Sequence, residues 1–143
     1  MAITCTLSNH YKFQLLSGNI DFDADTFKII LMNTTFAFDR DAHATRADVT
    51  ANQLATGNGY TQDDKTLANA QVSEDDVNDK GKATFDNVTW TASGGDIGPT
   101  GAAIIYDDTT ADDTVVGCID FGTDYTVPDG SSFQLQNLEV NVS

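Results

Sequence analysis

The sequence predicts an all-β fold, an antiparallel sandwich or small barrel with one short N-terminal helix. Residues that favour strands and turns (Thr, Asn, Asp and Gly) are abundant, whereas the helix former Glu occurs only at Glu74 and Glu139. Roughly seven or eight short apolar runs alternate with turn signals, a spacing typical of sandwiches and barrels. The length of 143 residues fits a single domain, residues 1–143.

The first expected element is a short helix over residues 8–18. Ser8 supplies a capping side chain, Tyr11 and Leu15 share one face, and Gly18 can end the helix in the left-handed conformation. The segment 26–33 follows. Its nearly continuous apolar run predicts a strand that is buried on both faces.

The middle of the chain is more polar, and its elements are less distinct. Phe36 and Phe38 alternate with small residues, and the Gly-Asn-Gly-Tyr sequence of residues 57–60 indicates a turn. A polar strand is expected over residues 65–72. The acidic residues of 74–79 then predict a second turn.

The segment 82–92 is a strand whose apolar period shifts. Phe85 has an odd number, whereas Val88 and Trp90 have even numbers, so the apolar side chains change faces unless the strand is interrupted. We therefore expect a bulge or kink at residues 86–87. Trp90 lies in the apolar phase and is expected in the core.

The last third of the chain predicts three more strands. Residues 93–101 have the composition of a loop, and the apolar segments 102–106 and 114–121 form a hairpin. The last strand, 133–142, also changes phase. A second break is expected near residues 136–137.

The charge is strongly negative, with twenty-two acidic residues against seven basic ones and a net charge of −15. Such a field repels phosphate, so neither a nucleic acid nor an anionic membrane is expected as a partner. No apolar run reaches the ~20 residues of a membrane helix, and no signal peptide is recognisable. We expect the protein to act where it is made, or to leave by a route other than secretion. Cys5 and Cys118 are expected to remain separate, reduced thiols.

The residues capable of chemistry form no recognisable site. Asp21-Phe-Asp-Ala-Asp25 begins like a calcium-binding loop, but Thr26 and Met32 stand where that loop needs Gly and Glu. His10 and His43 belong to no spaced set of zinc ligands. No nucleophile elbow, phosphate loop or dinucleotide motif occurs. The sequence therefore predicts no catalytic residue, no metal, no cofactor and no enzymatic activity.

A series of short motifs extends over nearly the entire chain, at residues 15–32 (LLSGNIDFDADTFKIILM), 57–61 (GNGYT), 88–92 (VTWTA), 102–106 (AAIIY) and 117–122 (GCIDFG). In this order they resemble the small virion structural proteins of tailed bacteriophages, of the capsid cement or decoration type. The resemblance implies a jelly-roll or related β fold, no enzymatic activity, and the phage major capsid protein as binding partner.

The same resemblance implies a homo-oligomer, a dimer or trimer, on the outer capsid surface of a virion assembled in the host cytoplasm. The acidic charge favours the outside of the shell over its DNA-filled interior. Residues 1–7 are the expected contact arm, because Ile3, Cys5 and Leu7 alternate with other residues and have no evident partner.

Three alternatives remain open at this level. One is another virion component, such as a tail or neck protein. The second is a carbohydrate-binding module that uses Trp90 or tyrosines as stacking platforms. The third is a hydrolase, which requires a pocket with paired acids whose pKa values are displaced.

Overall fold

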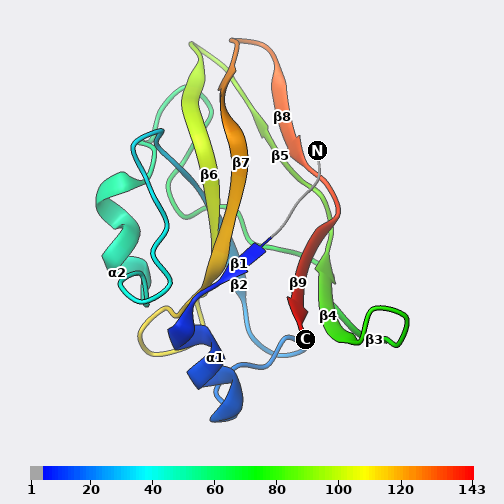
Figure 1. Ribbon diagram of the computed structural model, residues 1–143. Coiled ribbons are helices and arrows are strands. Elements are labelled where there is room, and N and C mark those ends of the chain that lie inside the picture. The colour runs from blue at the N-terminus through cyan, green and yellow to red at the C-terminus, as the bar shows by residue number, and fades with distance from the viewer. Residues whose placement is uncertain (1–4) are drawn as a thin grey trace.

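Three antiparallel sheets and two short α-helices form the structure of residues 5–143, the part of the chain that the computed structural model describes (Figure 1). The strand orders are β1-β7-β6-β2, β3-β4-β9 and β5-β8, and within residues 5–143 no sheet closes into a barrel. The all-β, sandwich-like class predicted from the sequence is confirmed. The strands are β1 (Cys5–Leu7), β2 (Phe27–Met32), β3 (Gln71–Asp75), β4 (Lys80–Phe85), β5 (Val88–Thr91), β6 (Ile97–Asp107), β7 (Val115–Val127), β8 (Ser132–Leu135) and β9 (Leu138–Val142). The helices are α1 (Asn9–Leu16) and α2 (Arg46–Val49), the latter followed by a 3₁₀ turn (Thr50–Asn52).

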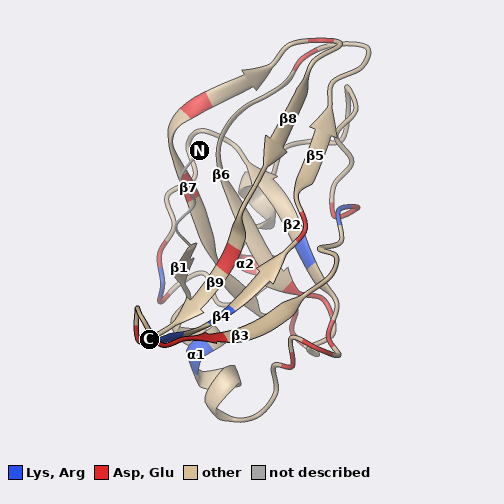
Figure 2. Cartoon of the chain, turned by 90° about the vertical axis from the view of Figure 1, so that its right-hand side faces the viewer, with Lys and Arg blue, Asp and Glu red and all other residues tan. Residues whose placement is uncertain are grey.

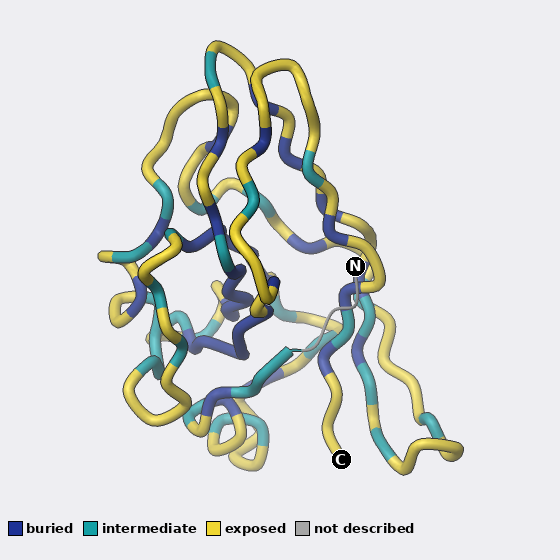
Figure 3. The backbone as a smooth tube through the Cα atoms, turned by 45° about the horizontal axis from the view of Figure 1, so that its top comes forward, coloured by how far each residue is buried: buried dark blue, intermediate teal, exposed yellow. Residues whose placement is uncertain are grey.

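The four-stranded sheet buries both of its faces. Ile29 and Leu31 of β2 point into the main core, which this sheet shares with the other two sheets. Ile30 and Met32 point the other way, into a smaller core that also holds Val49 of α2. The apolar run of residues 26–33 has the two-sided burial that it predicted. Figure 3 shows that buried residues gather in the middle of the molecule and that exposed residues predominate in the outlying loops.

The other two sheets form one antiparallel ribbon with a kink in the middle. Phe85 of β4 pairs with Leu138 of β9, and Val88 of β5 pairs with Leu135 of β8, so the register is the same on both sides of the kink. Between these pairs lie residues 86–87 on one strand and 136–137 on the other. Both breaks expected from the shifts of apolar phase are confirmed, and they stand opposite each other.

The helix α1 begins and ends close to its predicted limits. The Ser8 side chain accepts a hydrogen bond from the Tyr11 backbone N–H at 3.0 Å, and its hydroxyl donates to the Val115 carbonyl of β7. Gly18 has a φ of 78°, in the left-handed region that terminates helices. The cap therefore fixes the start of the helix to the four-stranded sheet.

Two expected elements differ from the sequence predictions, and two others, β1 and α2, were not expected. The polar strand expected over 65–72 lies instead at β3, because residues 65–67 bond to the edge of β2 at only isolated points, among them the Leu67 N–H to the Phe27 carbonyl. The loop expected over 93–101 ends early, and β6 starts at Ile97. Gly98 and Pro99 resemble loop residues in sequence, but a register shift between Ile97 and Thr100 accommodates them within the strand.

The two cysteines are free, as expected, and lie on adjacent strands. Cys5 stands opposite Ile119, whose side chain is in the main core, and packs against that core. Cys118 belongs to the smaller core on the other face of the sheet. Because their side chains point to opposite faces, the two thiols cannot form a disulfide without a change of register.

Trp90 is confirmed as a core residue, with 0% of its surface exposed. We expect Trp90→Ala to lower the free energy of unfolding by about 3–5 kcal/mol, because it removes a large buried side chain and leaves a cavity. Denaturant melts measure the loss. The control is Thr89→Ala on the exposed face of the same strand, expected within about 0.5 kcal/mol of the wild type. A Trp90→Ala loss below 1 kcal/mol would contradict the assignment.

Candidate functional site

An apolar groove of about 150 Å³ separates α1 from the β3-β4-β9 sheet. It lies on the side of the sheet that continues the main core. Of its lining residues, Tyr11 belongs to the main core and Phe22 packs against that core, whereas Val72 and Val142 are exposed. We refer to it as the apolar groove; its lining residues are Tyr11, Leu15, Phe22, Val72, Gly81, Lys82, Ala83, Val140 and Val142.

The strand register explains why this groove exists. Val72, Ala83 and Val140 stand in one row across the three strands, and the next row contains Gly81 and Val142. Since Gly81 has no side chain, the second row is hollow at its centre. Val72 and Val142 remain 58% and 42% exposed, so the apolar face of the sheet extends beyond its cover.

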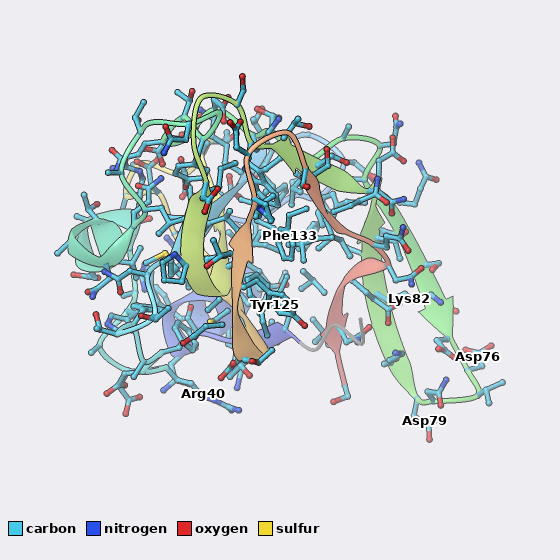
Figure 4. The ribbon with its side chains drawn as sticks, turned by 90° about the horizontal axis from the view of Figure 1, so that it is seen from above. Arg40, Asp76, Asp79, Lys82, Tyr125 and Phe133 are labelled. Atoms are coloured by element: carbon cyan, nitrogen blue, oxygen red, sulfur yellow. The ribbon has the colours of Figure 1, made fainter. Side chains whose placement is uncertain are left out.

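An acidic hairpin borders this groove. It consists of β3, β4 and the turn 76–79, and Figure 4 shows it extending away from the rest of the chain, with Asp76 and Asp79 at its end. Figure 2 shows the acidic residues along β3 and its turn. Lys80 is already paired, with its Nζ 2.8 Å from Glu139 Oε1 and 4.0 Å from Asp75 Oδ2. The hydrogen bond from Lys80 lowers the pKa of Glu139, which therefore stays charged.

A larger cleft, of about 700 Å³, lies on the other face of the four-stranded sheet. Its floor consists of small residues of β6 and β7, namely Gly101, Ala102, Cys118 and Gly122. We call it the sheet cleft. The remaining lining residues are Thr6, Thr34, Phe36, Ala37, Phe38, Asp120, Thr123 and Asp124.

The structure corrects the expected contact arm. Ile3 lies outside the described residues. Cys5 and Leu7 are paired with β7 in strand β1, and both side chains pack half-buried against the main core. The premise that this segment has no partner within the chain is therefore wrong for residues 5–7, and Thr6, which lines the sheet cleft, lies on the other face of the strand. Contact of the segment with another protein stays a prediction. The pairing of β1 with β7 was not predicted, because the alternation of apolar residues over only three positions is too short to indicate a strand.

Neither the groove nor the cleft was identified from the sequence. One signal was present: an isolated glycine within a strand, such as Gly81, marks a place where space is left or a backbone approaches. The alternation of Phe36 and Phe38 was another. Neither signal tells which distant residues complete the site.

The acidic and histidine residues considered as metal ligands have partners within the chain. Asp21 Oδ1 accepts the Asp23 N–H at 2.9 Å, and Asp25 Oδ2 accepts the Asp21 N–H at 3.0 Å, so these carboxylates cap their own turn. His10 bonds to Asp112, and His43 lies beside Phe36. Within residues 5–143, no three His, Cys, Asp or Glu side chains are grouped as metal ligands.

The burial of Trp90 bears on the carbohydrate-binding alternative. With no exposed surface, Trp90 cannot act as a stacking platform, so that version of the alternative is wrong. Its ring lies beside Phe133, with centroids 6.2 Å apart, and Phe133 contacts Tyr125 in turn (Figure 4). These rings fill the gap between β7 and the β5-β8 sheet and belong to the core packing.

Asp107, at the end of β6, is buried and faces the carboxyl group of Asp25. Its Oδ1 accepts the Thr109 N–H at 2.9 Å, while its buried Oδ2 has no hydrogen-bond partner among the described residues. Burial, together with the nearby carboxyl group of Asp25, raises the pKa of Asp107 to about 7. Asp107 therefore holds its proton to a higher pH than an exposed aspartate does, because an ionised carboxylate without a partner is costly to bury.

This pair predicts that the protein loses stability between about pH 4 and pH 7. The folded pKa is raised, so the stabilisation is fully present below the unfolded value and disappears as the pH rises through about 7. Asp107→Asn, which cannot titrate, should remove this slope in urea melts. Asp23→Asn, at an exposed acid in the turn before β2, should leave the slope unchanged; a wild-type slope retained in Asp107→Asn contradicts the raised pKa of Asp107.

Among residues 5–143, no helix has the length and apolar character needed to cross a membrane. Comparisons of the chain with protein-family models, with curated proteins and with solved structures found no significant match.

Proposed function

We propose that this chain is a non-enzymatic structural protein that binds a protein lattice, as capsid cement or decoration proteins do, with the phage major capsid protein as its partner. The observation that carries the proposal is the apolar groove, where the face of the β3-β4-β9 sheet continues beyond its cover. Exposed apolar surface of this kind marks protein contact sites. On α1 beside it, Leu16 is 90% exposed.

The charge around the groove specifies the kind of partner. The acidic hairpin borders the apolar surface with carboxylates. Of its two lysines, Lys80 is neutralised within the chain, whereas Lys82 lines the groove and forms no ion pair among the described residues. A partner that offers an apolar side chain within a basic surface complements both features. A basic patch on a capsid protein has this character, whereas nucleic acid and anionic membranes do not.

The site on the virion and the state of assembly follow as parts of the same proposal. An acidic protein fits the outer capsid surface better than the DNA-filled interior. A dimer or trimer on a repeating lattice gains avidity even where single contacts are weak. A tail or neck location is the principal alternative, and mass spectrometry of separated heads and tails distinguishes the two.

The test is co-sedimentation with capsids that lack the protein. We expect Val72→Ser with Val142→Ser to weaken binding at least about tenfold, since burying one valine contributes about 1.5 kcal/mol or more. Val77→Ser is the matched control, because Val77 is 91% exposed at the tip of the hairpin and does not line the groove.

Salt gives a second measurement in the same assay. Occupancy should fall as ionic strength rises, because the Debye length is only about 10 Å at 0.1 M. If the wild-type protein never sediments with capsids at any ionic strength, the lattice-binding proposal is wrong. If the groove variant binds as well as the control, the groove is not the contact.

A further inference from the structure

The sheet cleft is a second surface with a defined chemical character. Its floor is low because Gly101, Ala102, Cys118 and Gly122 of β6 and β7 have small side chains or none. At about 700 Å³ it has the volume of a ligand site rather than of a packing defect. It opens on the face of the four-stranded sheet that points away from the other two sheets.

One wall of the cleft is aromatic. Phe36 and Phe38 line it, and the His43 ring lies beside both, with its centroid 5.0 Å from that of Phe36 and 5.7 Å from that of Phe38. The wall is held in place by hydrogen bonds of the following turn, where His43 Nδ1 accepts the Asp39 N–H at 3.0 Å. The faces of such rings attract cations.

The cleft is also lined by two acidic residues and by no basic one. Asp120 and Asp124 of β7 line it, and its lining residues include no Lys, Arg or His. Neither carboxylate belongs to an ion pair among the described residues. Asp120 Oδ1 accepts the Gly122 N–H at 2.8 Å, which restrains the orientation of the carboxyl group. An aromatic wall beside two carboxylates favours a planar cation.

We propose that the sheet cleft binds an arginine side chain of a protein partner. A guanidinium group stacks on aromatic rings and donates paired hydrogen bonds to carboxylates, which matches both sides of this cleft better than a lysine ammonium does. The cleft volume exceeds that of one side chain, so the residues beside the arginine enter with it. The inference rests on the proposed function for the statement that the partner is a protein.

The cleft and the apolar groove lie on opposite faces of the four-stranded sheet, because one adjoins the smaller core and the other the main core. One copy of the chain therefore offers separate contacts to two neighbouring subunits. A protein that stabilises a lattice needs such a pair of contacts, because one contact alone decorates a subunit without linking it to the next.

The experiment titrates the ¹⁵N-labelled full chain with N-acetyl-arginine amide and follows backbone amide shifts by NMR. We expect saturable shifts in the millimolar range at residues 34–38, 101 and 120–124. N-acetyl-citrulline amide, a neutral analogue of nearly the same shape, should bind at least tenfold more weakly. Equal shifts with both compounds, or shifts outside the cleft, would overturn the proposal.

Two double variants separate a local effect from net charge. Asp120→Asn with Asp124→Asn should reduce arginine binding at least tenfold, and it keeps the Asp120 oxygen that accepts the Gly122 N–H. Asp76→Asn with Asp79→Asn removes the same charge from the acidic hairpin and should change binding less than twofold. Equal losses in both variants, or shifts at the cleft with methyl glucoside that match those with arginine, contradict an arginine site.

Capsid binding then distinguishes this inference from the proposed function. If arginine binds in the cleft but the chain never sediments with capsids, the cleft assignment stands and the lattice role is wrong. If the chain sediments with capsids and the Asp120→Asn, Asp124→Asn variant binds them as well as the hairpin variant does, the cleft is not a partner contact and the inference fails.

Discussion

The constraint on which the structure depends is that the strands β2, β6 and β7 are apolar on both faces. A sheet of this kind is stable in water only if each face is covered. The kinked ribbon of β4, β5, β8 and β9 covers one face and forms the main core. The segment that includes Phe36, Phe38 and Val49 covers the other face. The rest of the fold consists of these two covers and the turns that connect them to the sheet.

Both proposed contact surfaces lie where a cover ends. On the outer face, the cover that contains Phe36 and Phe38 leaves Gly122 exposed, and the sheet cleft lies beside it. On the inner face, the ribbon extends past α1, and Gly81 leaves its centre hollow. The segment with Phe36 and Phe38 does not cover the whole outer face of the sheet, and α1 does not cover the whole inner face of the ribbon. The molecule therefore has exposed concave surfaces without any loss of core packing. The incomplete cover on each face therefore produces the surfaces available for binding.

Local patterns in the sequence were sufficient to predict most of the strands and the helix α1, but they were insufficient to predict the groove and the cleft. The phase shifts at residues 86–87 and 136–137 predicted both breaks, because the period of two reports directly which face is buried. Nothing local indicates that these breaks stand opposite each other, since pairing between distant strands leaves no periodic trace in either one. The sheet cleft needed the same missing information, because its wall and its carboxylates are about eighty residues apart in sequence. Gly98 and Pro99 led to a wrong prediction of a loop for a different reason. Both residues favour turns, but β6 accommodates them through a register shift.

The distribution of charge separates the two kinds of association proposed for this chain. Three of its seven basic residues, Lys28, Arg46 and Lys80, form ion pairs within the described structure, so most of the acidic surface lacks neutralisation from the chain itself. Contact between two copies brings together two molecules of net charge −15, a repulsion that salt relieves. Contact with a basic partner is an attraction that salt weakens. Self-association and lattice binding therefore respond to ionic strength with opposite signs. An oligomer on the lattice is then favoured by the partner, whose positive charge reduces the repulsion between neighbouring copies.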